Sequence, residues 1–270
     1  PAVLSANASF AGVDASLSDL QRLSREGVIR RYVVIERGGL RFGIFGSLGK
    51  EALIYTSGGA TTFADATASA REVVKILRET EKVDVVVALS HGGLEKGPDG
   101  AYHDGEDVRL AKDVPGIDVV ISGHSHTELN EAIIVNGRTP VVQTGKESRN
   151  LGELVLALDG DKLIVESYRL HPIDDTILGD HAIAADIETL KKSVSAAAFA
   201  SRGYSIDQPL AIAPRDLPNT FTDIEAGTLL ANLVTDAFRM ATKADIGFTA
   251  NGMMRAGLLR GKTGVQTVYD

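Results

Sequence analysis

The chain has 270 residues, 44% of them apolar, a net charge of −8 and no cysteine. This length and apolar content suffice for one large domain and part of another. Without cysteine, the chain has no disulfide, thiolate metal ligand or cysteine nucleophile. Lysine and arginine form no block that would follow a phosphate backbone, which argues against a nucleic acid polymer as partner. No run approaches the roughly 18 to 20 apolar residues that cross a bilayer, so we expect no membrane span.

The first half of the chain has the pattern of alternating strands and helices. Residues 32–45 predict a hairpin that turns at Gly38-Gly39, and residues 61–80 predict an alanine-rich helix. Three apolar runs then predict sheet strands, at residues 83–90, 117–123 and 139–145. The first of these runs is apolar almost without interruption, which is expected of a strand covered on both faces. The pattern indicates an α/β fold.

The second half begins with a predicted hairpin at residues 151–170, turning at Asp159-Gly160. Residues 180–200 are alanine-rich and helical in pattern, and the irregular, proline-bearing text after them suggests a domain junction. The remaining expected elements are a helix over about 223–242, a short strand at 244–249 and a turn at 251–252.

Three histidines follow two of the predicted strands. His91 comes at the end of the run at 83–90, and His124 and His126 come just after the run at 117–123. Strand ends in α/β folds bring side chains from separate segments to one crevice. If the segment is extended, His124 and His126 point the same way and Ser125 turns aside. Three imidazoles in such places, each in a loop that contains glycine, indicate a metal site.

A site that handles phosphate with two cations also needs carboxylates. The acidic residues after His91 are interpreted as solvated or helix-capping charges, and they are Glu95, Asp99, Asp104, Glu106 and Asp107. His103 is expected to lie in a solvated loop, and His171 and His181 are expected to be structural or exposed. We therefore expect the remaining ligands to lie outside this chain.

The runs ALSHGGLEKG, GEDVRLAKDVPGIDVVISGHSHT and VVQTGKESRNLGELVLALDGDKL match a known pattern in order, spacing and context. They resemble the second half of the calcineurin-like metallophosphoesterase domain, in its 5′-nucleotidase branch. The resemblance implies a partial, layered α/β/β/α sandwich over residues 1–175, a linker helix at 176–205, and the start of an α+β C-terminal domain at 206–270.

The resemblance also implies a two-metal hydrolase of phosphate esters, nucleotides first among them. Two divalent ions, zinc, manganese or iron, would activate a water for attack on phosphorus. Carried over residue by residue, His91 and His124 would bind one metal ion and His126 the other. The Asp-x-His and Gly-Asn-His motifs of the family have no match here, and the first residues of the chain resemble the text that follows those motifs. The expectation is that a preceding N-terminal segment of the same protein, outside these 270 residues and either cleaved to a separate chain or removed, supplies them, and that this chain alone holds metal weakly.

The resemblance is weaker in the substrate-binding motif. The Asn-x-Gly-Gly-x-Arg pattern of the branch appears here as ANGMMR, so Gly252 and Arg255 fit, while Ala250 and Met253 do not. A second arginine of the family aligns with Thr222. Arg255, with Gly252 and Asn251, is the predicted substrate contact.

The alternatives left open are another substrate and another class of protein. A cyclic nucleotide, a nucleotide sugar or a sulfur conjugate would suit the same architecture, and a non-catalytic binding module could retain it. The enzymes that the chain resembles mostly work in the periplasm or outside the cell, and we expect the same location here.

Overall fold

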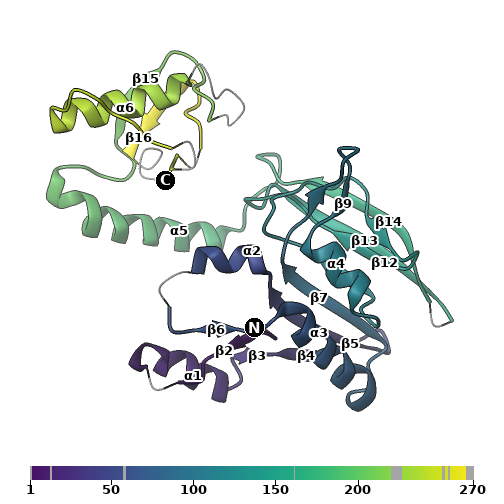
Figure 1. The fold of residues 1–270 in the computed structure, drawn as a ribbon. Helices are drawn as coiled ribbons and strands as arrows, with labels where there is room; N and C mark the ends of the chain where they lie inside the picture. Colours follow the sequence, from purple (N-terminus) through teal and green to yellow (C-terminus); the bar gives the residue numbers. More distant parts are fainter. Residues whose placement is uncertain are drawn as a thin grey trace. The chain divides into compact units, whose positions relative to one another are not determined.

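The computed structural model describes residues 2–12, 14–56, 59–160, 162–219, 227–250, 253–254 and 256–265. The chain divides into two compact units, Pro1–Ile177 and Leu178–Asp270 (Figure 1). In the described residues, no helix is both long and apolar enough to cross a bilayer.

A six-stranded mixed sheet organises the first unit. Its strands, in spatial order, are β11 (Ile133–Val135), β12 (Thr139–Val142), β10 (Val119–Ile121), β7 (Val85–His91), β5 (Leu40–Leu48) and β4 (Tyr32–Arg37). The four central strands run parallel, and the two edge strands run antiparallel to their neighbours. The carboxyl ends of β5, β7 and β10 therefore lie side by side at one edge of the sheet.

Two helices cover one face of this sheet, and they are α3 (Ala66–Lys75, continued by a π-helical turn at Ile76–Thr80) and α4 (Glu106–Asp113). The core lies between them and the strands. Phe45, Val86, Ala88 and Val120 share the face that α3 and α4 cover, and each is fully buried. Because side chains alternate along a strand, Leu89 and Ile121 point to the opposite face.

That opposite face is only partly covered in the described part of the chain. Leu89 is 39% exposed and Ile121 44% exposed, although both belong to central strands. The expectation that the strand at 83–90 is covered on both faces is wrong at this end. A run of apolar residues shows that a strand is central, but it does not show which of its faces is packed.

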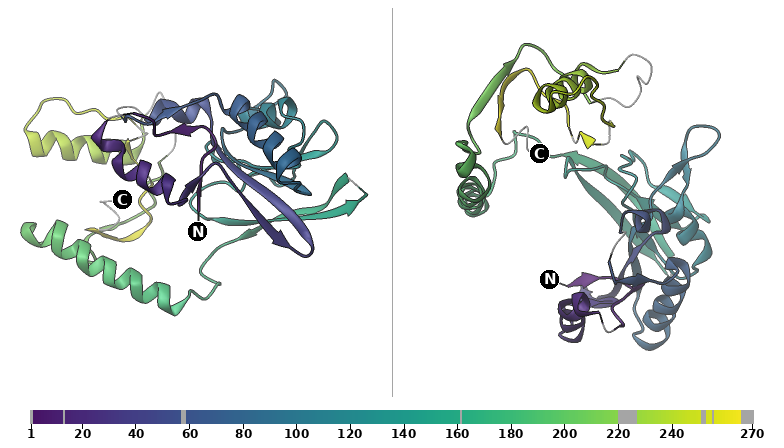
Figure 2. Two further views of the ribbon diagram at one scale, coloured as in Figure 1. Left: turned by 90° about the horizontal axis from the view of Figure 1, so that it is seen from below. Right: turned by 60° about the vertical axis from the view of Figure 1, so that its left-hand side comes forward.

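A long hairpin, β13 (Asn150–Asp159) and β14 (Lys162–Pro172), packs beside the sheet (Figure 2). Tyr168 of β14 joins the core and donates a hydrogen bond to the carbonyl of Gln143, just after β12, at 3.1 Å. The smaller elements of this unit are three strand pairs, β1 (Val3–Leu4) with β3 (Ile29–Arg30), β2 (Ala8–Ser9) with β6 (Thr62–Phe63) and β8 (Glu95–Lys96) with β9 (Tyr102–Asp104), together with α1 (Ser18–Arg25), α2 (Lys50–Leu53) and 3-10 turns at Ala15–Leu17 and Ile54–Thr56.

The described residues of the second unit form two helices and one strand pair. They are α5 (His181–Val194, continued through turns at Ser195–Phe199 and Ala200–Arg202), β15 (Pro209–Ala213), α6 (Leu229–Thr242) and β16 (Gly261–Gly264), with β15 antiparallel to β16. Asp180 caps α5 by accepting hydrogen bonds from two backbone N–H groups, and Thr228 caps α6 in the same way with one.

Most of the expected elements form. The hairpin at 32–45 turns at Gly38 and Gly39, both with positive φ, as a tight turn between paired strands requires. The expectation of a strand at 244–249 is wrong, since none of the described strands pairs with this segment. Its apolar side chains are not packed either, because Ile246 and Phe248 are more than 80% exposed. The turn expected at 251–252 lies outside the described residues.

Candidate metal centre

The sheet topology brings the two histidine loops together. His91 is the last residue of β7, and the loop at 122–127 follows β10. These strands are parallel neighbours, with Leu89 opposite Ile121, so both loops leave the sheet at its carboxyl edge. This edge is where ligands bind in open α/β sheets.

The rings of His91 and His124 face each other at this edge. Their centroids are 5.1 Å apart, and the planes meet edge to face at 64°. Burial lowers the pKa of His91 below its ordinary value, and nearby His124 and His126 lower it further, while Asp107 opposes them. The neutral imidazole favoured by these neighbours is the form that binds a metal ion.

The loop that carries His124 and His126 is not extended. His124 has φ 70° and His126 has φ 55°, so both residues are left-handed. The expectation of an extended segment, with Ser125 turned aside, is therefore wrong. The hydroxyl of Ser125 instead accepts a hydrogen bond from the N–H of Leu94 at 3.0 Å. The reason is that β10 ends at Ile121, before the glycine, and the chain then turns tightly.

Two glycines allow the close approach of the loops. A Cβ at Gly123 would lie 2.9 Å from Nδ1 of His91, and a Cβ at Gly93 would lie 3.5 Å from the ring of His124. Gly93 also has a positive φ of 94°. These positions let the backbone pass directly beside the imidazoles.

Asp107 is the acidic residue for which the expectation of a solvated or capping charge is wrong. It is 1% exposed, and one of its carboxylate oxygens accepts hydrogen bonds from the N–H of Gly93 at 3.0 Å and from the hydroxyl of Ser122 at 2.5 Å. Burial raises the pKa of Asp107, and the hydrogen bonds from Ser122, Ser90 and Gly93 work against that rise. Asp107 thus ties the loop after β7 to the loop after β10.

Gln143 is a second residue of the site that the sequence patterns did not reveal. It follows β12 directly and is 2% exposed. Its carboxamide makes hydrogen bonds to four residues of the loop at 122–127, and they are Ser122, Gly123, Ser125 and Thr127. The available signal was a polar residue placed directly after an uninterrupted apolar strand, which is unusual unless its hydrogen bonds are satisfied.

The donor set fits part of a metal site. His91 and His124 are adjacent, and His126 is close enough to affect the pKa of His91. Within the described ranges, no group of three or more histidine, aspartate or glutamate side chains is arranged to hold an ion. The residues present therefore suit imidazole coordination by neighbouring rings, and a complete coordination shell needs further ligands.

The remaining histidines lie elsewhere. His103 is exposed beside Asp99, with Nδ1 3.5 Å from a carboxylate oxygen, and His171 is exposed beside Glu153 at 2.7 Å. His181 is exposed at the start of α5. The predicted substrate contacts Asn251, Gly252 and Arg255 lie outside the described residues, as does Thr222.

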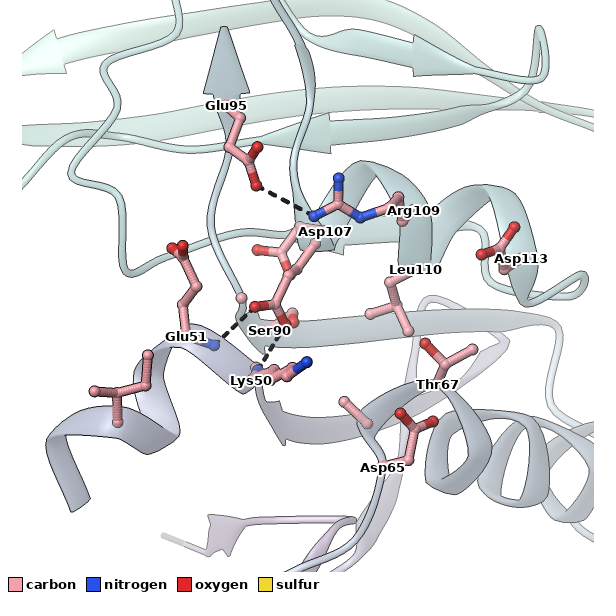
Figure 3. Close-up of a pocket in the computed structure, with 15 residues that line it drawn as sticks. Lys50, Glu51, Asp65, Thr67, Ser90, Glu95, Asp107, Arg109, Leu110 and Asp113 are labelled. Atoms are coloured by element: carbon pink, nitrogen blue, oxygen red, sulfur yellow. Dashed lines mark hydrogen bonds and ion pairs between the residues drawn. The ribbon is translucent and has the colours of Figure 1, made fainter. Parts of the chain in front are cut away.

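A cavity of about 550 Å³ is lined by Gly92, in the loop after β7, and by Asp107 of α4 (Figure 3). Its rim carries charges of both signs, with Glu95 paired to Arg109 at 3.2 Å. Glu106 accepts hydrogen bonds from the backbone N–H groups of Lys50 and Glu51, at 2.6 and 2.8 Å. A second cavity, of about 540 Å³, is lined by His91, Leu89 and Ile121 on the partly covered face of the sheet.

Known proteins resemble the chain in sequence and in fold. Residues 16–128 match the family model described as calcineurin-like phosphoesterase, and all three histidines fall inside this match. The trifunctional nucleotide phosphoesterase protein YfkN of Bacillus subtilis is 27% identical over 244 residues, which cover 88% of this chain and 16% of YfkN. A 5′-nucleotidase of Diplobatis ommata is 28% identical over 209 residues, covering 70% of this chain and 34% of that protein.

Among solved structures, a 5′-nucleotidase precursor from Thermus thermophilus superposes with a TM-score of 0.71 at 23% identity. The superposition covers 99% of this chain and 52% of that one. The chain thus spans about half the length, or less, of the proteins to which it is compared. The shared fold is mixed α/β with a central sheet, and the match to the calcineurin-like phosphoesterase model covers residues 16–128.

Proposed function

We propose that the protein is a metal-dependent hydrolase of phosphate esters that uses His91, His124 and His126 as metal ligands. The observation that carries the proposal is the contact between the rings of His91 and His124 at the carboxyl edge of the sheet, inside the matched domain. Imidazoles from separate loops converge there, and this is the arrangement that a catalytic metal ion needs.

The cofactor of this proposal is a pair of divalent ions, zinc, manganese or iron. His91 and His124 would hold one ion and His126 the other. Bound ions of this kind supply an activated water and neutralise the charge that develops on a phosphoryl group. The residues of this chain orient the imidazoles, keep His91 neutral and bring the two loops within reach of each other.

The proposed substrate is a nucleotide, hydrolysed as a phosphomonoester. The names of YfkN and of the two 5′-nucleotidases support this class. Arg255, with Gly252 and Asn251, is the proposed contact for the substrate. Because Ala250 and Met253 depart from the motif of the branch, a cyclic nucleotide, a nucleotide sugar or a sulfur conjugate is the alternative substrate within the same fold.

The proposal includes a preceding N-terminal segment of the same protein as the source of the remaining ligands. Its support is the cavity beside His91, where the apolar side chains of Leu89 and Ile121 are exposed. Apolar side chains on central strands gain stability when another layer covers them. We also propose a periplasmic or extracellular location, which rests on the resemblance to enzymes of this branch and agrees with the lack of cysteine.

The test combines metal analysis with an assay. Elemental analysis and hydrolysis of a generic aryl phosphate are measured on this chain alone and together with the preceding segment. We expect about two metal ions and turnover in the combined sample, and weak metal binding with little turnover in the chain alone.

Variants assign the effect to the histidines. His91→Ala and His124→Ala are expected to lower metal content and activity together, while His103→Ala, an exposed histidine of β9, is the matched control and keeps both. A combined sample with neither metal nor turnover would refute the hydrolase and favour a non-catalytic binding module.

A further inference from the structure

The loop at 122–127 adopts a conformation that costs free energy. His124 and His126 are both left-handed, a conformation that is strained for residues other than glycine. Two of them within three residues persist only if the surroundings fix the backbone. The loop therefore needs a partner that satisfies its backbone and holds it in place.

The side chain of Gln143 contacts both ends of this loop. Its Nε2 donates to the carbonyl of Gly123 at 3.0 Å and to the hydroxyl of Ser122 at 2.8 Å, and its Oε1 accepts from the N–H of Thr127. The hydroxyl of Ser125 lies 3.2 Å from both carboxamide atoms. One buried amide thus supplies a donor and an acceptor to the backbone on either side of the two histidines.

Gln143 is itself held firmly. Its carbonyl accepts hydrogen bonds from the N–H of Leu129 and from the hydroxyl of Tyr168, both at 3.1 Å. It follows β12, whose four residues are all buried. A side chain with a fixed backbone and satisfied hydrogen bonds is a rigid support for the groups that it contacts.

Ser122 extends this support to the other histidine loop. Its hydroxyl accepts from Gln143 and donates to Asp107, which accepts from the N–H of Gly93, two residues after His91. Ser125 makes a second link, through the N–H of Leu94. The chain of contacts therefore runs from Gln143 to the loop of His91.

We infer that Gln143, acting through Ser122, is a positioning residue that holds the loop at 122–127 in the conformation that sets the His124 ring against the His91 ring. The role as a support for metal ligands rests on the proposed function. A carboxamide is suited to it because it donates at one atom and accepts at the other. A leucine offers neither, and a glutamate loses the donor.

The first experiment measures ring placement without metal. The imidazoles of the six histidines are labelled with ¹³C, their signals are assigned by single substitution, and the contact between the rings of His91 and His124 is followed by nuclear Overhauser effects. We expect the contact in the wild-type protein and its loss in Gln143→Leu. Ser122→Ala, a milder change, is included in case the leucine variant does not fold, and it should weaken the contact.

Thr139→Val is the matched control. Thr139 is 3% exposed, lies four residues before Gln143, and donates a hydrogen bond to the carbonyl of Ile117 at 3.0 Å. Its removal takes away a buried hydrogen bond outside the histidine loop, so it should lower stability and leave the ring contact unchanged. An unchanged contact in both Gln143→Leu and Ser122→Ala would overturn the inference.

The second experiment measures the consequence for metal binding. Cobalt(II) affinity and its visible absorption spectrum are recorded for the same variants. Loss of an outer hydrogen-bonding partner typically lowers metal affinity by about 10- to 100-fold, so we expect a decrease of about tenfold for Ser122→Ala and about a hundredfold for Gln143→Leu, each with an altered spectrum. Thr139→Val should keep the wild-type spectrum.

The two experiments separate the two hypotheses. If the wild-type chain shows the ring contact and its dependence on Gln143 but binds no metal even when it is combined with the preceding segment, the proposed function fails and the positioning role stands. If the protein binds metal with the same affinity and spectrum in every variant, the positioning role fails and the proposed function stands.

Discussion

Gly123 sets how closely the loop after β10 approaches His91. A Cβ at this position would lie 2.9 Å from Nδ1 of His91, which is closer than such contacts normally come. The neighbour is the end of a side chain rather than backbone, so the ring can turn away at little cost to folding. A substitution here is therefore expected to separate ligand placement from stability.

We predict that Gly123→Ala lowers metal affinity by about tenfold or more, because a displaced ligand loses at least as much as a missing outer hydrogen bond. Competition with a chromophoric chelator measures the affinity, and urea unfolding measures the stability. Gly59→Ala is the control, since a Cβ there meets its nearest atom at 4.0 Å. Equal affinities in the two variants would contradict the prediction.

At the level of elements, Tyr168 fastens the β13–β14 hairpin to the sheet. Its hydroxyl donates to the carbonyl of Gln143, and burial raises the pKa of Tyr168 above its usual value of 10.0. The folded state thus holds the phenol proton more tightly than the unfolded state. The resulting stabilisation is complete below about pH 10 and is lost as the pH rises through the folded-state pKa.

We predict that Tyr168→Phe lowers the free energy of unfolding by about 1 kcal/mol at pH 7, the usual contribution of one hydrogen bond. The variant should also lose less stability than the wild type between pH 7 and pH 10.5, because it has no phenol to ionise. Urea titrations at both pH values test this. Tyr204→Phe, at an exposed tyrosine, should change the free energy by less than about 0.5 kcal/mol.

The short helix α2 depends on a residue distant in sequence. Gly49 at its N-cap makes no side-chain cap, and Glu106 at the start of α4 accepts the hydrogen bonds from Lys50 and Glu51 instead. We predict that Glu106→Ala lowers the free energy of unfolding by about 1 kcal/mol, as loss of an N-cap does. Glu95→Ala, which breaks an exposed pair with Arg109 (Figure 3), should cost less than about 0.5 kcal/mol. If chemical denaturation gives similar losses of unfolding free energy in both variants, the hydrogen bonds from Lys50 and Glu51 to Glu106 do not stabilise the helix as a cap would.

The sequence patterns predict elements whose signals are local, and they do not predict contacts between distant segments. Periodicity and turn residues were enough for the hairpin at Gly38-Gly39 and for the order of strands and helices, because those signals are local. The roles of Glu106, Asp107 and Gln143 depend on contacts between segments 14 to 56 residues apart. Such contacts exist once the sheet has formed, so the patterns that lead us to propose the histidines as ligands did not predict the residues that hold their loops.

For the whole molecule, the position of the core determines which part of the chain is able to fold alone. The buried cluster and the side chains that pack on it all lie between Ala6 and Tyr168, inside the first unit. His91, His124, Asp107 and Gln143 lie there as well. We propose on this ground that residues 1–177 form an independent folding unit, since a segment with its own core is able to fold alone.

The corresponding prediction is that a fragment of residues 1–177 unfolds in one cooperative transition and binds metal with the affinity of the 270-residue chain, within about threefold or ~0.6 kcal/mol. The reason is that every residue assigned to ring placement is retained, together with the hairpin that fixes Gln143 through Tyr168. Urea unfolding followed by circular dichroism tests the first part, and chelator competition tests the second. A broad transition would show that the second unit contributes to the core, whereas a sharp transition with a large loss of affinity would show that a ligand or its support lies beyond residue 177.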